Sequence, residues 1–168
     1  INRKFERSFI KMAIISREQI VEGLVKILGE EQVITDEQVL KDSSIDRYRK
    51  YEQVCGVYTQ PIPAAVVYVK TPEQVSEVLS FANDNEINVV PRTGHSAIEG
   101  GLETALKDSV VIDGSMMNKV LKVDEYNMQV TCQCGVPLQE LDDMLRERGL
   151  TTGHSPQSKP LAQIGGLV

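Results

Sequence analysis

The sequence predicts an α+β fold in which a βαβ unit continues into a mixed sheet. Residues 64–69 are a short β-branched run typical of a buried strand, and residues 88–91 form a second strand-like run. The stretch between them has apolar residues at helical spacing. Strand, helix and strand therefore follow in the order of a βαβ unit, which implies parallel pairing. Two later runs, residues 119–123 and 128–132, enclose a polar turn and predict a hairpin.

Composition limits the classes of protein to consider. A chain of 168 residues allows one ordinary domain or two very small ones, and its 41% hydrophobic content can fill a core. The formal net charge is -6 and no basic face stands out, so we expect no nucleic-acid partner. No apolar run approaches the ~20 residues of a membrane span, and no secretory signal is evident, so we expect a cytoplasmic protein. Met12 is a candidate start, which leaves open whether the residues before it are native.

The first 60 residues are predicted to be an N-terminal extension with a helical leader. Ser16 opens a capping-box pattern, apolar residues follow at helical spacing, and Gly29 closes the helix. Residues 36–41 predict a second short helix. The charged, tyrosine-bearing residues 43–60 show no clear periodicity, so we expect them to wrap the surface before the main domain.

The main domain is predicted to span residues 61–168, after the boundary that two prolines mark. Thr71 is a helix N-cap followed by Pro72 at the first helical position. A third strand is predicted at residues 110–113. Pro137 opens an amphipathic helix that ends at a glycine, and the remaining residues have the composition of a loop.

Three cysteines, Cys55, Cys132 and Cys134, lack the spacing of a disulfide framework. On a strand, the last two thiols would lie on the same face, where we expect them to pack as small apolar side chains. A metal or redox role is the alternative, and with only two histidines in the chain a zinc site would be hard to assemble.

The strongest candidate site is the run Arg92-Thr93-Gly94-His95-Ser96, which directly follows a predicted strand. The carboxyl ends of parallel strands are where α/β folds bind ligands. Glycine permits a backbone that turns successive N–H groups toward one anion, and the hydroxyls of Thr93 and Ser96 add donors. Arg92 would supply a charge or pair with a nearby carboxylate. An ordinary turn is the alternative, because the spacing matches neither a Rossmann nor a Walker A motif.

Two weaker candidates follow. Residues 151–156, running on to residues 164–166, combine hydroxyls, a histidine and glycines that could wrap a ligand, with a solvent loop as the alternative. Residues 113–118 are the other, with a plain turn as the alternative. No carboxylate pair, Ser-His-Asp order or metal quartet can be defended, so an enzyme of this sequence would depend on a cofactor for its chemistry.

These segments, in this order, resemble flavoproteins of the vanillyl-alcohol oxidase / p-cresol methylhydroxylase (PCMH) kind. Residues 91–101 resemble the pyrophosphate loop P-R-G-G-G-T-G-L-S-G-G of the glycolate oxidase and D-lactate dehydrogenase branch, at equal length. Residues 111–120 and 135–141 are similar to the strand and the helix start that follow it. Residues 153–166 are similar to the G-H-x-P stretch and the later G-G of alkyldihydroxyacetonephosphate synthases. Residues 16–60 resemble the leader of the glycolate oxidase group.

The resemblance implies a PCMH-type FAD-binding domain, with FAD as the cofactor, bound noncovalently. The backbone N–H groups that would hold its pyrophosphate belong to Arg92, Thr93, Gly94, His95 and Ser96. The residues that would line the flavin and its phosphate-ribose arm are Gly153, Pro156, Ser158, Gly165 and Gly166.

The implied function is the FAD-binding part of an oxidoreductase that acts on a small 2-hydroxy acid-like molecule. Two alternatives stay open: an FAD-dependent alkyl transferase acting on dihydroxyacetone phosphate esters, and a non-catalytic nucleotide-binding remnant. Family members continue well past the I-G-G motif. The resemblance therefore implies an N-terminal fragment, incomplete at its C-terminus, that lacks the substrate domain and is inactive alone. Apolar surface left open in such a fragment would favour self-association.

The loop departs from the family at two positions, since Thr93 and His95 stand where glycines are usual. Both residues carry a Cβ, so we expect the loop to avoid glycine-only conformations there. Relatives of the berberine-bridge type bind FAD covalently through a histidine in R-S-G-G-H-S. In the equal-length alignment His95 replaces a glycine and not that histidine, which leaves covalent attachment as the less favoured alternative.

Overall fold

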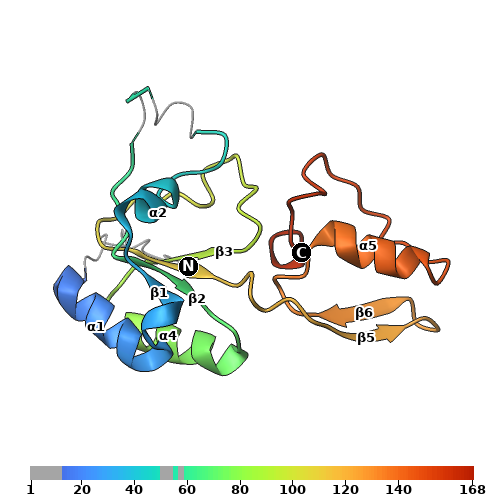
Figure 1. The fold of residues 1–168 in the computed structure, drawn as a ribbon, viewed down its shortest axis with the longest axis horizontal. Helices are drawn as coiled ribbons and strands as arrows, with labels where there is room; N and C mark the ends of the chain where they lie inside the picture. The colour runs from blue at the N-terminus through green and yellow to red at the C-terminus, as the bar shows by residue number, and fades with distance from the viewer. Residues whose placement is uncertain (1–12, 50–54, 57–58) are drawn as a thin grey trace, which may run out of the picture.

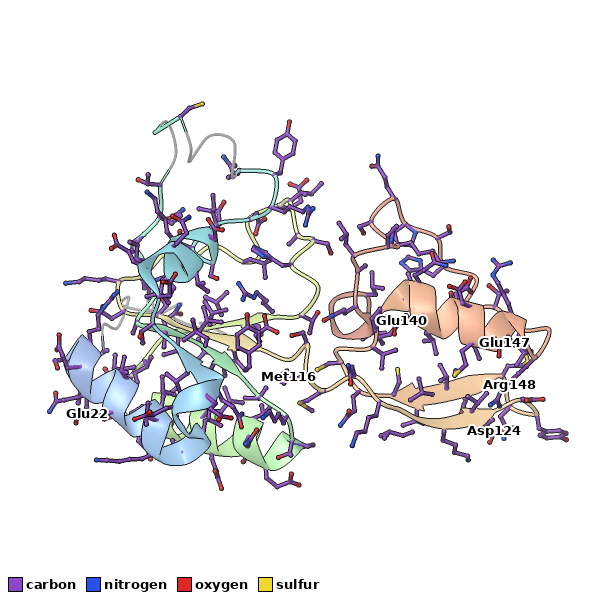
Figure 2. The ribbon with its side chains drawn as sticks, in the orientation of Figure 1. Glu22, Met116, Asp124, Glu140, Glu147 and Arg148 are labelled. Atoms are coloured by element: carbon purple, nitrogen blue, oxygen red, sulfur yellow. The ribbon has the colours of Figure 1, made fainter. Side chains whose placement is uncertain are left out.

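A computed structural model describes residues 13–49, 55–56 and 59–168 of the chain. The prediction about the residues before Met12 lies outside this part. Figure 1 shows two halves: a larger one that holds a sheet with helices on its faces, and a smaller one built on a hairpin and a helix. Met116, labelled in Figure 2, lies in the connection between them.

A four-stranded sheet forms the larger half. Its strands are β1 (Val33–Ile34), β2 (Ala65–Tyr68), β3 (Val89–Arg92) and β4 (Val110–Asp113), in the order β1-β2-β4-β3. Both β2 and β3 pair in parallel with β4, while β1 pairs antiparallel with β2. The predicted βαβ unit and mixed sheet are confirmed, with β4 inserted between the two strands of that unit. Three parallel strands thus end at one edge of the sheet.

Helices cover both faces of this sheet (Figure 1). Helices α1 (Arg17–Leu28) and α4 (Pro72–Asp84) pack against one face, and α2 (Glu37–Asp42) lies on the other. A short 3-10 helix, η1 (Glu30–Gln32), leads from α1 to β1. The capping box at Ser16 and the Thr71 cap form as predicted. Alternate residues of each strand face opposite helices, as the two-residue period of a strand requires.

The smaller half starts with an antiparallel hairpin of β5 (Val120–Asp124) and β6 (Gln129–Cys132). Helix α5 (Leu138–Arg146) packs against it through a separate apolar cluster that includes Val136, Leu141 and Leu145. The last residues return to this cluster and contain a 3-10 helix, η2 (Ile164–Gly166). The predicted hairpin, amphipathic helix and terminal loop are therefore confirmed.

Two expectations were wrong. Residues 43–46 do not wrap the surface, because Ser44, Ile45 and Asp46 are fully buried, with hydrogen-bond partners inside the protein. The thiols of Cys132 and Cys134 do not share a strand face, since β6 ends at Cys132. Cys132 packs against the α5 cluster, whereas Cys134 packs against the core of the larger half.

Candidate functional site

A cavity of about 670 Å³ lies where the three parallel strands end. Val69 follows β2, residues 91–97 comprise the end of β3 and the loop after it, and Gly114 follows β4, so each strand contributes to one wall. Pro72, the first residue of α4, also lines the cavity, which places the positive end of that helix dipole there. The smaller half supplies the opposite wall through Cys134 and parts of residues 158–167.

Most of the predicted site residues come together at this cavity. Those that line it are Arg92, Thr93, Gly94, His95, Ser96, Ser158, Gly165 and Gly166. Gly153 and Pro156 lie outside its lining. Their neighbour His154 lines a second cavity of about 340 Å³, between α5 and the hairpin. The structure therefore unites the loop after β3 with residues 158–166, but not with the G-H-x-P turn.

The backbone after β3 carries donors with no internal acceptor. Within the described chain, the N–H groups of Thr93, Gly94 and Ser96 donate no hydrogen bond. All three residues are half-buried beside the cavity. Amides in such a position normally find an acceptor, so this part of the wall is suited to an anion.

Gly94 brings the two walls into close contact. A Cβ added there would lie 2.3 Å from the carbonyl oxygen of Leu161 and 3.0 Å from the backbone N of Gln163. These are backbone atoms, and they cannot swing aside like a side chain. The loop and residues 161–163 therefore meet backbone to backbone, which requires glycine at this position.

The Arg92 side chain is engaged in hydrogen bonds inside the protein. Its Nε donates to Asp113 Oδ2 at 2.7 Å and its Nη1 to Ser43 Oγ at 2.7 Å, all inside the protein. Asp113 also accepts from the backbone N–H of Ser115 at 2.9 Å. Of the two roles proposed for Arg92, the structure shows the carboxylate pair. This pair ties the end of β3 to the end of β4, directly under the loop.

His95 adopts a left-handed backbone with φ 49°. We expected the loop to avoid glycine-only conformations at this position, and this value lies in the small left-handed region that residues with a Cβ can enter. A ring nitrogen, Nε2, lies 3.3 Å from the carbonyl oxygen of Ile45. The histidine is thus anchored to the segment that precedes the domain.

Gly165 and Gly166 have N–H groups that already donate within the protein, and Gly165 also allows the backbone to approach Cys134 closely. Gly165 N donates to the Cys134 carbonyl at 2.7 Å, and Gly166 N donates to the Gln163 carbonyl at 3.1 Å. A Cβ at Gly165 would lie 2.6 Å from the Cβ of Cys134. Burial raises the pKa of the Cys134 thiol, which keeps it protonated at neutral pH.

Three residues of the site escaped the sequence analysis. The first is Gln163, which lines the cavity and whose buried Oε1 finds no donor among the described residues. It stands directly before the recognised I-G-G motif, so its position was the only available signal. The second is Asp46, whose carboxylate accepts from the backbone N–H groups of Gly100 and Leu102, the latter at 2.8 Å. No pattern in the sequence pointed to it.

The third is Asp142, a buried carboxylate on α5 that fixes the loop leading back to the cavity. It accepts from Lys159 Nζ at 2.6 Å, Thr151 Oγ1 at 2.7 Å, Arg146 Nε at 2.7 Å and Thr152 N at 3.0 Å. The Lys159 ammonium, followed by these other donors, holds the pKa of the Asp142 carboxyl well below its usual range. This arrangement pins residues 151–159 and so sets the position of Ser158.

Metal and membrane features can be judged for the same part of the chain. No group of three or more His, Cys, Asp or Glu side chains there could hold a metal ion. Among the helices described, none has the length and apolar character needed to cross a bilayer.

Comparisons with known proteins identify the family of this chain. The family model described as "FAD binding domain" matches residues 63–168. The FAD-linked oxidoreductase YgcU of Escherichia coli (strain K12) is 62% identical over 154 residues, covering 92% of this chain and 32% of that protein. D-lactate dehydrogenase [cytochrome] 1 of Saccharomyces cerevisiae is 32% identical over 154 residues, covering 90% of this chain and 25% of that protein. The chain thus spans about a third of the first relative and a quarter of the second.

Solved structures show the same fold. One of alkyldihydroxyacetonephosphate synthase matches with a TM-score of 0.79 and 25% identity, covering 93% of this chain and 32% of that chain. One of p-cresol methylhydroxylase matches with a TM-score of 0.64 and 20% identity, covering 79% of this chain and 25% of that chain. The second match concerns the fold alone.

Proposed function

This chain belongs to the FAD binding domain family, and we propose that it is the FAD-binding part of an oxidoreductase that acts on a 2-hydroxy acid. The observation that carries the proposal is the wall after β3. There the N–H groups of Thr93, Gly94 and Ser96, which have no acceptor in the described chain, lie beside a cavity at the ends of parallel strands. A diphosphate offers the acceptors that these donors lack.

The remaining lining residues also fit FAD. The hydroxyls of Thr93, Ser96 and Ser158 line the cavity beside these amides. Gln163 has a buried amide oxygen that lacks a donor among the described residues, which a sugar or ribityl hydroxyl would provide. Apolar residues such as Val69 and Met117 line the cavity as well, and they suit the ring systems of a dinucleotide.

The chain's own residues would bind and orient the cofactor. A bound flavin supplies the hydride-accepting chemistry of an oxidoreductase, which protein side chains lack. We propose that the binding is noncovalent, because His95 Nε2 lies at hydrogen-bond distance from the Ile45 carbonyl. Arg92 and Asp113 would keep the loop seated on the sheet, and Gly94 would let it approach residues 161–163.

Adding FAD to the purified 168-residue chain tests this proposal. We expect a yellow protein that retains flavin through gel filtration and releases it into the supernatant on acid precipitation. Flavin that stays in the precipitate would refute noncovalent binding. A colourless protein with no measurable FAD affinity by calorimetry would refute the binding site itself.

The substrate class is supported by the relatives. One is a D-lactate dehydrogenase, and another, 30% identical over 137 residues, is a D-2-hydroxyglutarate dehydrogenase of Danio rerio. A transferase is the second candidate, because the alkyldihydroxyacetonephosphate synthase structure covers nearly all of this chain. In the complete protein that carries this sequence, loss of flavin colour on anaerobic addition of D-lactate or D-2-hydroxyglutarate would support the oxidoreductase. Colour that persists with these acids, together with alkyl exchange on an acylated dihydroxyacetone phosphate, would favour the transferase.

A further inference from the structure

Residues 43–47, which we call the clamp segment, run along the back of the loop that lines the cavity. Ser43 Oγ accepts from Arg92 Nη1 at 2.7 Å, and the Ile45 carbonyl lies 3.3 Å from His95 Nε2. The N–H of Arg47 donates to the carbonyl of Ala97 at 3.3 Å. The clamp segment therefore contacts the cavity-lining stretch near its start, in its middle and at its end.

The contacts continue past the cavity. The carbonyl of Ser44 accepts from both the N–H and the Oγ1 of Thr104, at 3.0 Å and 3.2 Å. The carboxylate of Asp46 accepts hydrogen bonds from the backbone N–H groups of Gly100 and Leu102, which follow the loop. Hydrogen bonds to an ionised acceptor are roughly twice as strong as neutral ones. Asp46 therefore gives the clamp segment two charge-assisted contacts with the backbone that follows the loop.

The clamp segment explains how a loop with residues other than glycine keeps its conformation. The loop has side chains at Thr93 and His95, and His95 has a left-handed backbone. A non-glycine residue in that region is strained and persists only where its surroundings hold it there. The clamp segment provides that enforcement, because it holds the loop on both sides of His95. Asp46 also occupies the amides of the glycine turn at Gly100. Among the described residues, the N–H groups of Thr93, Gly94 and Ser96 are left without acceptors, beside the cavity.

We propose that Asp46 is a positioning residue for FAD binding: together with the clamp segment it presets the loop after β3 in the conformation that receives the cofactor's diphosphate. The inference rests on the proposed function for the identity of the ligand. The presetting itself concerns this chain alone and can be measured without FAD. Asp46 lies on the far side of the loop and is absent from the cavity lining. Its effect would be indirect.

Asp46→Asn tests the inference in the 168-residue chain. The amide keeps the shape of the carboxylate, but it turns one acceptor into a donor that faces a backbone N–H. We expect the Kd for FAD to rise about tenfold or more, the scale of losing one hydrogen bond to a charged group. Asp36→Asn is the matched control. Asp36 also accepts from a backbone N–H, that of Val39 at 3.0 Å, but it caps α2 away from the cavity.

Hydrogen exchange of the FAD-free protein provides the second readout. We expect residues 93–97 to exchange faster in Asp46→Asn than in the unmodified chain, while α1 exchanges at an unchanged rate. Thr104→Val serves if Asp46→Asn fails to fold. It keeps the shape of the side chain and removes the hydroxyl that lies 3.2 Å from the Ser44 carbonyl and 2.6 Å from the Pro61 carbonyl, so it should weaken FAD binding a few-fold.

The outcomes separate the two proposals. If the unmodified chain binds FAD and both Asp46→Asn and Thr104→Val bind it equally well, the positioning role is wrong and the FAD site stands. If the unmodified chain binds no FAD, the proposed function is wrong. Hydrogen exchange then tests only whether Asp46 and the clamp segment preset the loop. Unchanged exchange at residues 93–97 in Asp46→Asn would overturn that inference.

Discussion

Replacing Gly94 by alanine should separate the two walls of the cavity. The added Cβ would lie 2.3 Å from the Leu161 carbonyl oxygen, more than about 1 Å inside an ordinary non-bonded contact of ~3.5 Å. Residues 161–163 cannot retreat freely, because the Ala162 carbonyl accepts from Leu138 N at 2.9 Å and Gln163 pairs with Pro137. One wall or the other must therefore move.

The size of the effect follows from the cost of overpacking a well-packed site, which is typically about 1–3 kcal/mol. For a chain of this length, that corresponds to a fall in Tm of roughly 3–10 °C. FAD affinity should fall in addition, because the N–H of residue 94 moves with the loop. Thermal unfolding followed by circular dichroism gives the first quantity, and calorimetric titration with FAD gives the second.

Gly101→Ala is the matched control for Gly94→Ala. Gly101 belongs to the same loop, but a Cβ there would meet only the Cβ of Ala97, at 4.0 Å. We expect this variant to keep its Tm to within about 1 °C, as for surface changes of less than about 0.5 kcal/mol. If Gly94→Ala matched this control in both Tm and FAD affinity, the backbone contact between the walls would not exist as described.

Three further predictions concern buried groups. Asp113→Asn breaks the buried pair with Arg92 and should lower the free energy of unfolding by about 3–5 kcal/mol, measured in urea; a loss below 1 kcal/mol would contradict it. The pKa of Asp142 is lowered on folding, so its stabilisation is present above about pH 4 and is lost as the pH falls further. Asp142→Asn should therefore be less stable at neutral pH and lose less stability below pH ~4 than the unmodified chain, and parallel pH profiles would refute this. Alkylation followed by mass spectrometry should modify exposed Cys55 before Cys134, because burial raises the pKa of the Cys134 thiol. Bound FAD should slow the alkylation of Cys134 further, since Cys134 lines the cavity. Equal rates of Cys134 alkylation with and without FAD would show that Cys134 is not part of the FAD-binding wall.

The sequence predicted the elements whose signals are local. The helix after Thr71 begins where the N-cap and proline place it, and the hairpin turns at residues 125–128, one position later than the predicted 124–127. The loop after β3 was located because it follows a strand and contains Gly94. Each of these features depends on a few neighbouring residues, which is why a single sequence sufficed.

Features that depend on distant contacts could not be predicted. The buried carboxylate of Asp46 accepts hydrogen bonds from backbone amides more than fifty positions away. The stretch that contains Asp46 is charged and aperiodic, so the sequence gives no sign of these partners. Gly153 shares a motif with residues that line the cavity, but the hydrogen bonds of Asp142 direct its turn elsewhere. The insertion of β4 between β2 and β3 is likewise a matter of topology, because parallel pairing alone does not say which strands are neighbours.

The clamp segment has a consequence for where this domain can be cut. The family match begins at residue 63, downstream of the clamp segment, of β1 and of α1. A protein trimmed to the matched region would leave Arg92 without Ser43 and expose the sheet face that α1 covers. We therefore expect the folding unit to extend upstream of the region that the family model matches, so swaps between relatives should keep residues 13–62 together with the matched region.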